Sequence, residues 1–225
     1  MQFDRKHFQF KHPYNSLIVG MTGSGKTILV RRILKNFKEL FYNLNKEEIK
    51  ILWAYGQWHH LIDIPLNDHV IIRYIEGLPN DEIINEFKPD IIVIDDLMNE
   101  MNKDSKFENI FIKKSHHLNI SIFFLVQNLF YNSKSMRTIS LNCHYIILMK
   151  NPRDKSQINH LAKQIFPSNS KYLIEAYNSA TEPVYGYIKI DLSPDTPEDL
   201  RLQSRTTPEE NCGKFSPIIY YPKNV

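Results

Sequence analysis

The sequence predicts an α/β fold of the P-loop NTPase type (ASCE, RecA-like), in which helices flank a mostly parallel central sheet. Two observations predict it. Short apolar runs typical of buried strands alternate along the chain with segments whose apolar residues recur at helical spacing. The first of these runs leads directly into residues 20–27, which have the pattern G-x-x-x-x-G-K-[ST] of a phosphate-binding loop.

The first half of the chain predicts three strands and two helices. Strands are expected at 16–19, 49–55 and 70–74, where apolar and β-branched residues gather. A short helix is expected at 81–87, with Asn80 as its N-cap and Lys88-Pro89 at its end. A longer helix is expected after the phosphate-binding loop, where these apolar residues recur: Leu29, Val30, Ile33, Leu34, Phe37, Leu40 and Phe41.

The second half continues the same alternation. Strands alternating with helices favour a mostly parallel sheet with helices on both faces, so we expect a P-loop domain over residues 1–190. Its remaining strands are expected at 90–96, 120–126, 143–150 and 184–190, and its remaining helices at 107–117 and 156–165.

Residues 191–225 have a different character, since five of the twelve prolines lie there. This composition predicts an extended tail rather than another layer of the sheet. A disordered terminus and an arm that packs on its own domain or on a neighbour both stay open. Five apolar residues favour the arm: Phe215, Ile218, Ile219, Tyr220 and Tyr221.

Charge, cysteine content and hydropathy exclude several classes of protein. The 28 Lys and Arg against 25 Asp and Glu give a net charge of +3, which is too mild to indicate a polyanionic partner by itself. Cys143 and Cys212 form no C-x-x-C pair, and the adjacent pairs His59-His60 and His116-His117 lack metal-ligand spacing. No apolar run has transmembrane length and no signal peptide opens the chain, so we expect a soluble intracellular protein with no membrane partner.

Residues 20–27 are expected to bind the phosphates of ATP. A glycine-rich loop lets successive backbone N–H groups converge on phosphate oxygens, and the helix that follows directs its positive dipole end at them. Lys26 supplies a positive charge, and the Thr27 hydroxyl is expected to bind Mg²⁺. The expected nucleotide-binding residues are Gly20, Met21, Thr22, Gly23, Ser24, Gly25, Lys26 and Thr27.

Polar side chains end two of the later strands. ATP hydrolysis needs a metal ion at the phosphates and a group that orients or deprotonates water. We expect Asp95 to hold Mg²⁺ beside Thr27, and Asp96 to act as the general base. Gln127 is expected to hold the attacking water through its amide. An Asp-rich turn and a glutamine that caps a loop remain the simpler alternatives.

An arginine is expected to complete the site, since positive charge opposite the γ-phosphate is commonly supplied by an arginine finger, in cis or from a neighbouring subunit. Arg137 and Arg153 both follow strands on the catalytic side of the sheet. The sequence does not rank them, and either one could be an ordinary surface arginine.

With these residues in place, the chain resembles the FtsK–HerA superfamily, specifically viral genome-packaging ATPases of Polinton-like, adintovirus and virophage elements, which are related to the poxvirus packaging ATPase. The resemblance covers about residues 14–205, and its more specific stretches are 94–98, 115–121, 126–130 and 151–155. The wider superfamily commonly has Asp-Glu where this chain has Asp95-Asp96, which weakens the assignment of Asp96 as the base.

The resemblance implies a homo-oligomeric ring that hydrolyses ATP with Mg²⁺ and moves double-stranded DNA, independently of sequence, into a preformed capsid. Capsid vertex proteins are implied partners, and the infected cell, with a possible association with the virion, is the implied location. Candidate DNA-contacting segments are 102–106 and 131–134, because translocation needs basic loops facing DNA phosphates. A P-loop kinase or other small-molecule phosphotransferase, and a module that binds nucleotide without turnover, stay open as alternatives.

Overall fold

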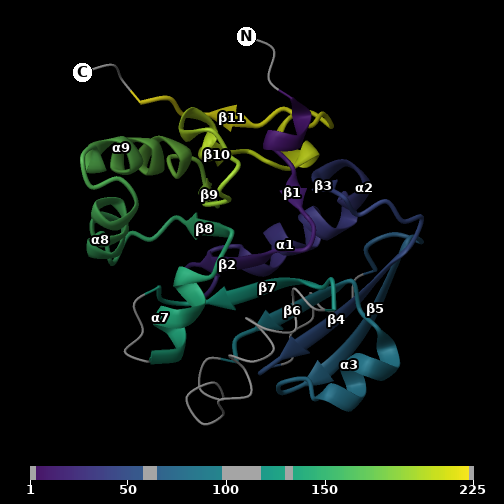
Figure 1. Ribbon diagram of the computed structural model, residues 1–225. Coiled ribbons are helices and arrows are strands. Elements are labelled where there is room, and N and C mark those ends of the chain that lie inside the picture. Colours follow the sequence, from purple (N-terminus) through teal and green to yellow (C-terminus); the bar gives the residue numbers. More distant parts are fainter. Residues whose placement is uncertain (1–3, 58–64, 98–117, 130–133, 223–225) are drawn as a thin grey trace.

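A nine-stranded sheet runs through the protein, with helices packed against it (Figure 1). The computed structural model describes residues 4–57, 65–97, 118–129 and 134–222. The strand order is β11-β10-β9-β8-β2-β7-β6-β4-β5. The six strands from β8 to β5 are parallel to one another, whereas β9, β10 and β11 form an edge in which each strand is antiparallel to the one before it.

The strands are β2 (Asn15–Val19), β4 (Ile49–Tyr55), β5 (Val70–Glu76), β6 (Ile91–Asp95), β7 (Ser121–Val126), β8 (Tyr145–Met149), β9 (Tyr187–Asp191), β10 (Leu202–Ser204) and β11 (Ile218–Ile219). A separate parallel pair consists of β1 (Phe10–Lys11) and β3 (Phe41–Tyr42). The α-helices are α1 (Lys26–Lys35), α2 (Phe37–Leu40), α3 (Asp81–Phe87), α7 (Lys134–Leu141), α8 (Ser156–Ile165) and α9 (Ser170–Ala180). The 3₁₀ helices within the described residues are η1 (Arg5–His7), η4 (Glu198–Leu200) and η5 (Pro208–Glu210).

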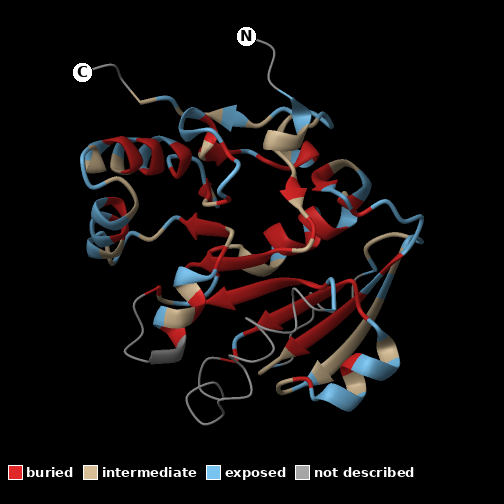
Figure 2. Cartoon of the chain, in the orientation of Figure 1, coloured by how far each residue is buried: buried red, intermediate tan, exposed pale blue. Residues whose placement is uncertain are grey.

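Each face of the sheet has its own hydrophobic core. Successive side chains of a strand point to opposite faces, and in β2 the buried Leu17 and Val19 belong to one core while Ile18 belongs to the other. Helices α1 and α2 cover the core that contains Ile18, and α3, α7, α8 and α9 cover the opposite core. The strands in the middle of the sheet are therefore buried throughout (Figure 2). Burial on both faces explains why these strands are continuous apolar runs in the sequence.

Most sequence predictions of elements are confirmed. Strands β2, β4, β5, β6, β7, β8 and β9 and helices α3 and α8 lie where they were expected, within a few residues. The side chain of Asn80 accepts a hydrogen bond from the Ile83 amide at 2.9 Å, so it is the N-cap of α3. The predicted helix 107–117 lies outside the described residues.

The prediction of one helix from residue 29 to residue 41 is wrong. The helix is interrupted at Asn36, whose side chain donates a hydrogen bond to the Arg32 carbonyl at 2.8 Å. Phe41 has extended backbone and pairs with Phe10, and the two rings are 5.8 Å apart. Its apolar character reflects this aromatic contact rather than a helical face.

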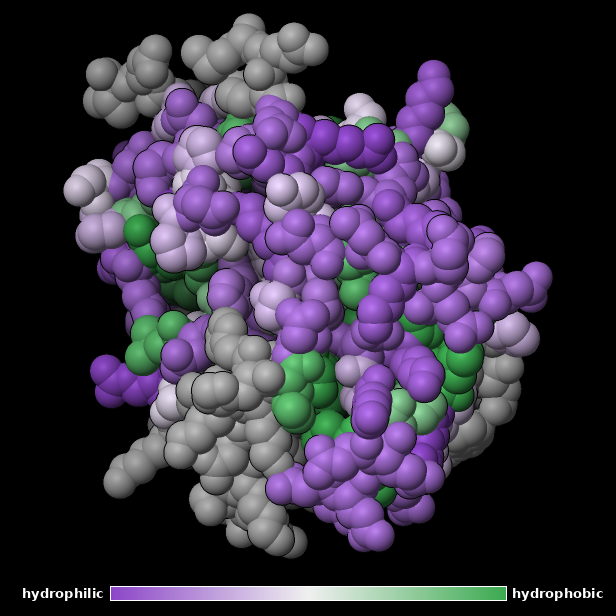
Figure 3. All heavy atoms as spheres, turned by 45° about the vertical axis from the view of Figure 1, so that its right-hand side comes forward, coloured by the Kyte–Doolittle hydropathy of each residue, from purple (hydrophilic) through white to green (hydrophobic). Residues whose placement is uncertain are grey.

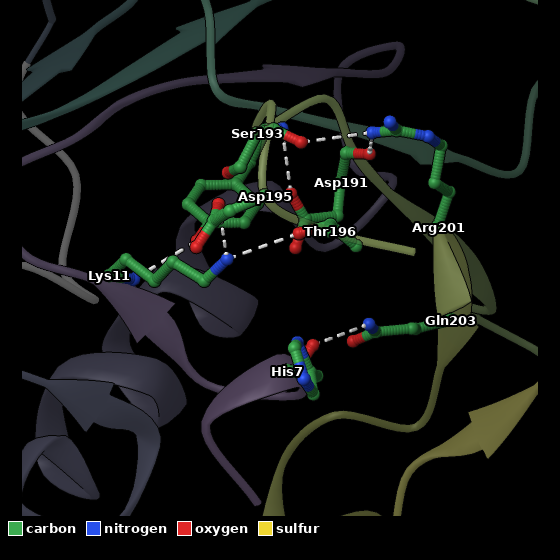
Figure 4. A network of polar contacts seen from close by, with 9 residues as sticks. His7, Lys11, Asp191, Ser193, Asp195, Thr196, Arg201 and Gln203 are labelled. Atoms are coloured by element: carbon green, nitrogen blue, oxygen red, sulfur yellow. Dashed lines mark hydrogen bonds and ion pairs between the residues drawn. The ribbon is translucent and has the colours of Figure 1, made fainter. Parts of the chain in front are cut away.

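The C-terminal segment differs from the predicted tail, because β10 and β11 extend the sheet. Leu200, Leu202 and Gln203 are fully buried there. Polar contacts join this edge to the N-terminal segment, where Gln203 donates to the His7 carbonyl at 3.1 Å and Lys11 binds Asp195 at 2.7 Å (Figure 4). A proline-rich composition did not preclude this packing, since the prolines lie mostly between the short strands. A domain boundary at residue 190 stays a prediction.

The face shown in Figure 3 is mostly hydrophilic, and its hydrophobic side chains gather in small recesses. Within the described ranges, no helix has the length and apolar character needed to cross a lipid bilayer.

Candidate functional site

The phosphate-binding motif forms the connection between β2 and α1. The Gly20 amide donates to the Val126 carbonyl at 3.1 Å, so the loop leaves the sheet beside the end of β7. Gly25 has φ 96°, a left-handed conformation that suits glycine, and α1 begins at the next residue. The loop therefore presents the start of a helix, with its free backbone N–H groups, at the carboxyl edge of the sheet.

The parallel register brings the other predicted residues to the same edge. Asp95 pairs with Leu125 of β7, and Val126 pairs with Val19 of β2, so the residues that follow these strands are neighbours. The Thr27 hydroxyl donates to the Asp95 carboxylate at 3.2 Å, and the Gln127 amide donates to the Asp96 carboxylate at 3.1 Å. These four side chains thus form two directly bonded pairs, whose members are 68 and 31 positions apart in sequence.

Lys26 lies in the first turn of α1 and turns back over the loop. Its ammonium group donates to the carbonyls of Gly20, at 2.5 Å, and Met21, at 3.2 Å. Burial lowers the pKa of Lys26, and the carboxylates of Asp95 and Asp96 partly oppose that shift. A phosphate that approaches this partly desolvated ammonium group would stabilise its charged form, because the phosphate carries the negative charge that the neutral carbonyls lack.

These side chains surround one cavity of about 500 Å³. Of the predicted residues, Thr22 to Thr27, Asp95, Asp96 and Gln127 line it. Gly20 and Met21 do not line it, although their carbonyls hold Lys26. The sequence analysis missed four lining residues, which are Ile28, Gln57, Leu125 and Tyr185. Gln57 follows β4 at the carboxyl edge, a position that could have indicated it, whereas Tyr185 lies in a turn with no motif.

A glycine that the sequence analysis did not single out shapes the acidic end. The Gly56 amide donates to the Asp95 carbonyl at 3.0 Å, and a Cβ on Gly56 would collide with the Asp96 carbonyl. Asp96 itself has φ 57°, a left-handed conformation that Asp tolerates better than most residues. The close approach of Gly56 thus fits the turn that directs Asp96 toward Gln127.

The side chains in this cavity are suited to binding Mg²⁺. The described part of the chain contains no group of three or more His, Cys, Asp or Glu that could hold a metal by itself. Mg²⁺ in nucleotide sites needs only one or two protein oxygens, because phosphates and waters supply the rest. The Thr27 hydroxyl and the Asp95 carboxylate provide two such oxygens, 3.2 Å apart.

Both predicted arginines are exposed, and neither lines the cavity. Arg137 lies in α7, and Arg153 lies in the connection after β8, where its amide donates to the Asn151 side chain at 3.1 Å. The structure therefore does not bring either arginine into the site of its own chain.

Several predicted segments lie outside the described residues. They include Lys103 and Lys106, residues 131–133, both histidine pairs and residues 115–117 of the stretch 115–121.

The fold has relatives among solved structures. No family model and no curated protein matches the sequence. The genome packaging NTPase B204 from Sulfolobus turreted icosahedral virus 2, in complex with sulfate, is 12% identical over 94% of this chain and 98% of that chain, with a TM-score of 0.53. B204 from Sulfolobus turreted icosahedral virus, a DNA-packaging ATPase, is 12% identical over 95% and 100% of the two chains, with a TM-score of 0.52. At this identity the similarity shows the fold alone, and it confirms the predicted α/β fold with a mostly parallel sheet flanked by helices.

Proposed function

We propose that this protein hydrolyses ATP at the carboxyl edge of its parallel strands. The observation that carries the proposal is that one cavity is lined by the phosphate-binding loop, Asp95, Asp96 and Gln127. A chance match to the loop motif would not be accompanied by an amide and two acids at the ends of the next two strands on one side of β2.

Each side chain has a role in this proposal. The loop amides and Lys26 bind the β- and γ-phosphates, and Thr27 with Asp95 holds Mg²⁺. Mg²⁺, when bound, would neutralise charge on the β- and γ-phosphate oxygens. Asp96 accepts a proton from the attacking water, and Gln127 orients that water while its bond to Asp96 keeps the two side chains together.

We further propose that the hydrolysis drives packaging of double-stranded DNA into a preformed capsid by a homo-oligomeric ring. The support is the resemblance to FtsK–HerA packaging ATPases, together with a fold shared with B204 over nearly the whole chain. The exposed positions of Arg137 and Arg153 agree with a finger donated to a neighbouring subunit, since neither lines the cavity of its own chain. Capsid vertex proteins would be the partners of such a ring.

The choice of activator distinguishes the motor from a kinase. The rate of ATP hydrolysis is measured with random-sequence double-stranded DNA and with small phosphate acceptors. A motor is stimulated by DNA, and its apparent DNA affinity falls with a log–log salt slope of roughly −3.6 if about four phosphates are neutralised. An assembled, ATP-competent ring that neither binds DNA nor is stimulated by it at low salt would exclude the motor, and stimulation only by a small acceptor would indicate the kinase.

Subunit mixing tests the shared site. Arg137→Ala and Arg153→Ala are each mixed with Lys26→Ala, so that an interface can combine an intact loop with an intact arginine. Recovery of hydrolysis is expected for the arginine that acts in trans, because such a finger contributes a factor of about 10³ or more. Co-assembly without recovery for both arginines would contradict a finger donated between subunits.

A further inference from the structure

Tyr185 is a large aromatic side chain in the wall of the candidate nucleotide cavity. It is 60% exposed, and its backbone has φ 59°, in the left-handed region. For a bulky residue without a turn-forming side chain this conformation is rare, and such outliers concentrate at ligand-binding positions.

The surrounding turn holds Tyr185 in this conformation. The Gly186 amide donates to the Pro183 carbonyl at 3.0 Å, and the Gly186 carbonyl accepts from the Lys150 amide at 3.0 Å. The Lys150 ammonium group donates to the Glu182 carbonyl at 3.1 Å. A Cβ on Gly186 would lie 2.5 Å from the Ala180 carbonyl oxygen, so the turn is packed closely against the end of α9. The turn is thus fixed between α9 and the end of β8.

The strand order puts Tyr185 on the opposite side of the phosphate-binding loop from the two acids. Strand β7, which Gln127 follows, and strand β6, which ends at Asp95, lie on one side of β2, and β8 and β9 lie on the other. Tyr185 precedes β9 at the same edge of the sheet, because Tyr187 pairs with Met149 at the end of β8. A Cβ on Gly25 would lie 3.3 Å from the Tyr185 ring, so the ring borders the loop directly.

We propose that Tyr185 stacks on the base of the bound nucleoside triphosphate. The inference rests on the proposed ATP site, in which the acids mark the γ-phosphate end of the ligand. The nucleoside then extends toward the other side of the loop, where Tyr185 presents a largely exposed ring. Stacking needs only a π-face, which every base has, so Tyr185 supplies affinity for the nucleoside with little discrimination among bases.

The test compares two ligands that share phosphates but differ in the nucleoside. Calorimetry measures the binding of Mg-ATP and of magnesium tripolyphosphate to the full chain and to four variants: Tyr185→Ala, Tyr185→Gly, Tyr185→Phe and Tyr221→Ala. Tyr185→Ala and Tyr185→Gly are expected to weaken ATP binding about 5- to 150-fold and to leave tripolyphosphate binding unchanged. Tyr185→Phe keeps the ring and retains ATP affinity. Tyr221→Ala, an exposed tyrosine remote from this cavity, serves as the control.

The Tyr185→Gly variant removes the ring without straining the turn, because glycine readily adopts the left-handed conformation. Three results would overturn the stacking role: undiminished ATP affinity without the ring, equal losses for both ligands, or a loss in Tyr185→Phe as large as in Tyr185→Ala. Wild-type protein that binds neither ligand would instead overturn the ATP site itself. Lys26→Ala is expected to weaken the binding of both ligands. This variant therefore distinguishes a loss of phosphate binding at the loop from a loss of base stacking at Tyr185.

Discussion

A half-buried lysine and a fully buried lysine illustrate the difference between the carboxyl edge of the parallel strands and the antiparallel edge of the sheet. Lys26 lies at the carboxyl edge of the parallel strands and lines an open cavity together with Asp95 and Asp96, whose carboxylates act on its charge. Lys189 lies in the antiparallel edge and is fully buried, where it donates to the Phe8 carbonyl at 2.9 Å and to the Gln203 side chain at 3.1 Å. Burial lowers the pKa of both, to about 8 for Lys189.

The surroundings give the two lysines different roles. The ammonium group of Lys189 lies 4.4 Å from the centre of the Phe10 ring and 5.0 Å from that of Tyr145, so aromatic faces and hydrogen-bond acceptors enclose it. Lys26 borders space that a ligand can enter. We therefore expect changes at the carboxyl edge to alter chemistry, and changes at the antiparallel edge to alter stability.

The largest effect is expected for Lys26→Ala. The loss of a charge-assisted phosphate contact should reduce ATP affinity by about 1.5–3 kcal/mol and abolish hydrolysis. The free energy of unfolding should change by less than about 1 kcal/mol, because a desolvated cation is removed. Binding of a fluorescent ATP analogue, steady-state hydrolysis and urea unfolding measure the three quantities. Lys35→Ala, exposed on the same helix, is the control, and normal ATP affinity and turnover in Lys26→Ala would exclude this loop as the site.

Gln203→Ala is the converse change. It removes one of the two hydrogen-bond acceptors of buried Lys189 and the partner of the His7 and Leu200 carbonyls, which should lower the free energy of unfolding by about 2–4 kcal/mol. Hydrolysis per folded molecule should not change. Urea unfolding measures the stability, and assays at urea concentrations below the unfolding transition measure the hydrolysis rate. Gln164→Ala, at an exposed position, is the control. A fall in the activity of fully folded Gln203→Ala protein would show that this edge contributes to catalysis.

A pH dependence follows from Lys189. Its pKa is lowered from 10.5 to about 8 in the folded protein, so between these values the unfolded chain keeps a proton that the folded protein has released. Stability should therefore rise with pH across this window. Relative to Lys189→Met, the free energy of unfolding should increase by on the order of 2–3 kcal/mol from pH 7 to pH 10. A relative decrease would mean that the fold stabilises the charged form.

The smallest effect is expected at the solvent-exposed end of the same network. Asp195→Asn removes the ion pair with Lys11, but the Asp195 side chain is 69% exposed. Exposed pairs contribute about 0.2–1 kcal/mol, and salt screens them. Urea unfolding at low and high salt should show a small difference that disappears at high salt. A difference that persists at high salt would indicate that Asp195 is important to the packing of this edge.

The same contrast explains what could be predicted from the sequence. Strand β6 was predictable because both of its faces are buried, which requires an unbroken apolar run. The pairing of Thr27 with Asp95 followed from a motif and from the convergence of parallel strands at one edge. Helix α9 could have been predicted, since Tyr172, Leu173, Ala176, Tyr177 and Ala180 form one buried face.

The remaining features had no such pattern. Strand β10 consists of Leu202, Gln203 and Ser204, and its polar residues are buried because they bond to distant parts of the chain. No local periodicity encodes contacts with residues almost 200 positions away. Tyr185 belongs to a turn whose conformation depends on α9 and β8 packed on either side, which a reading of neighbouring residues does not reveal.

In the proposed mechanism, Asp96 serves the attacking water rather than the metal. Single-turnover hydrolysis of ATP by Asp96→Asn measures it most directly, with equilibrium Mg-ATP binding on the same protein and the exposed Asp68→Asn as the control. We expect nearly normal Mg-ATP binding and a hydrolysis rate about 10²–10⁴-fold lower, because this is the usual contribution of a general base. A variant that retains more than about a tenth of the wild-type rate would contradict the assigned role of Asp96.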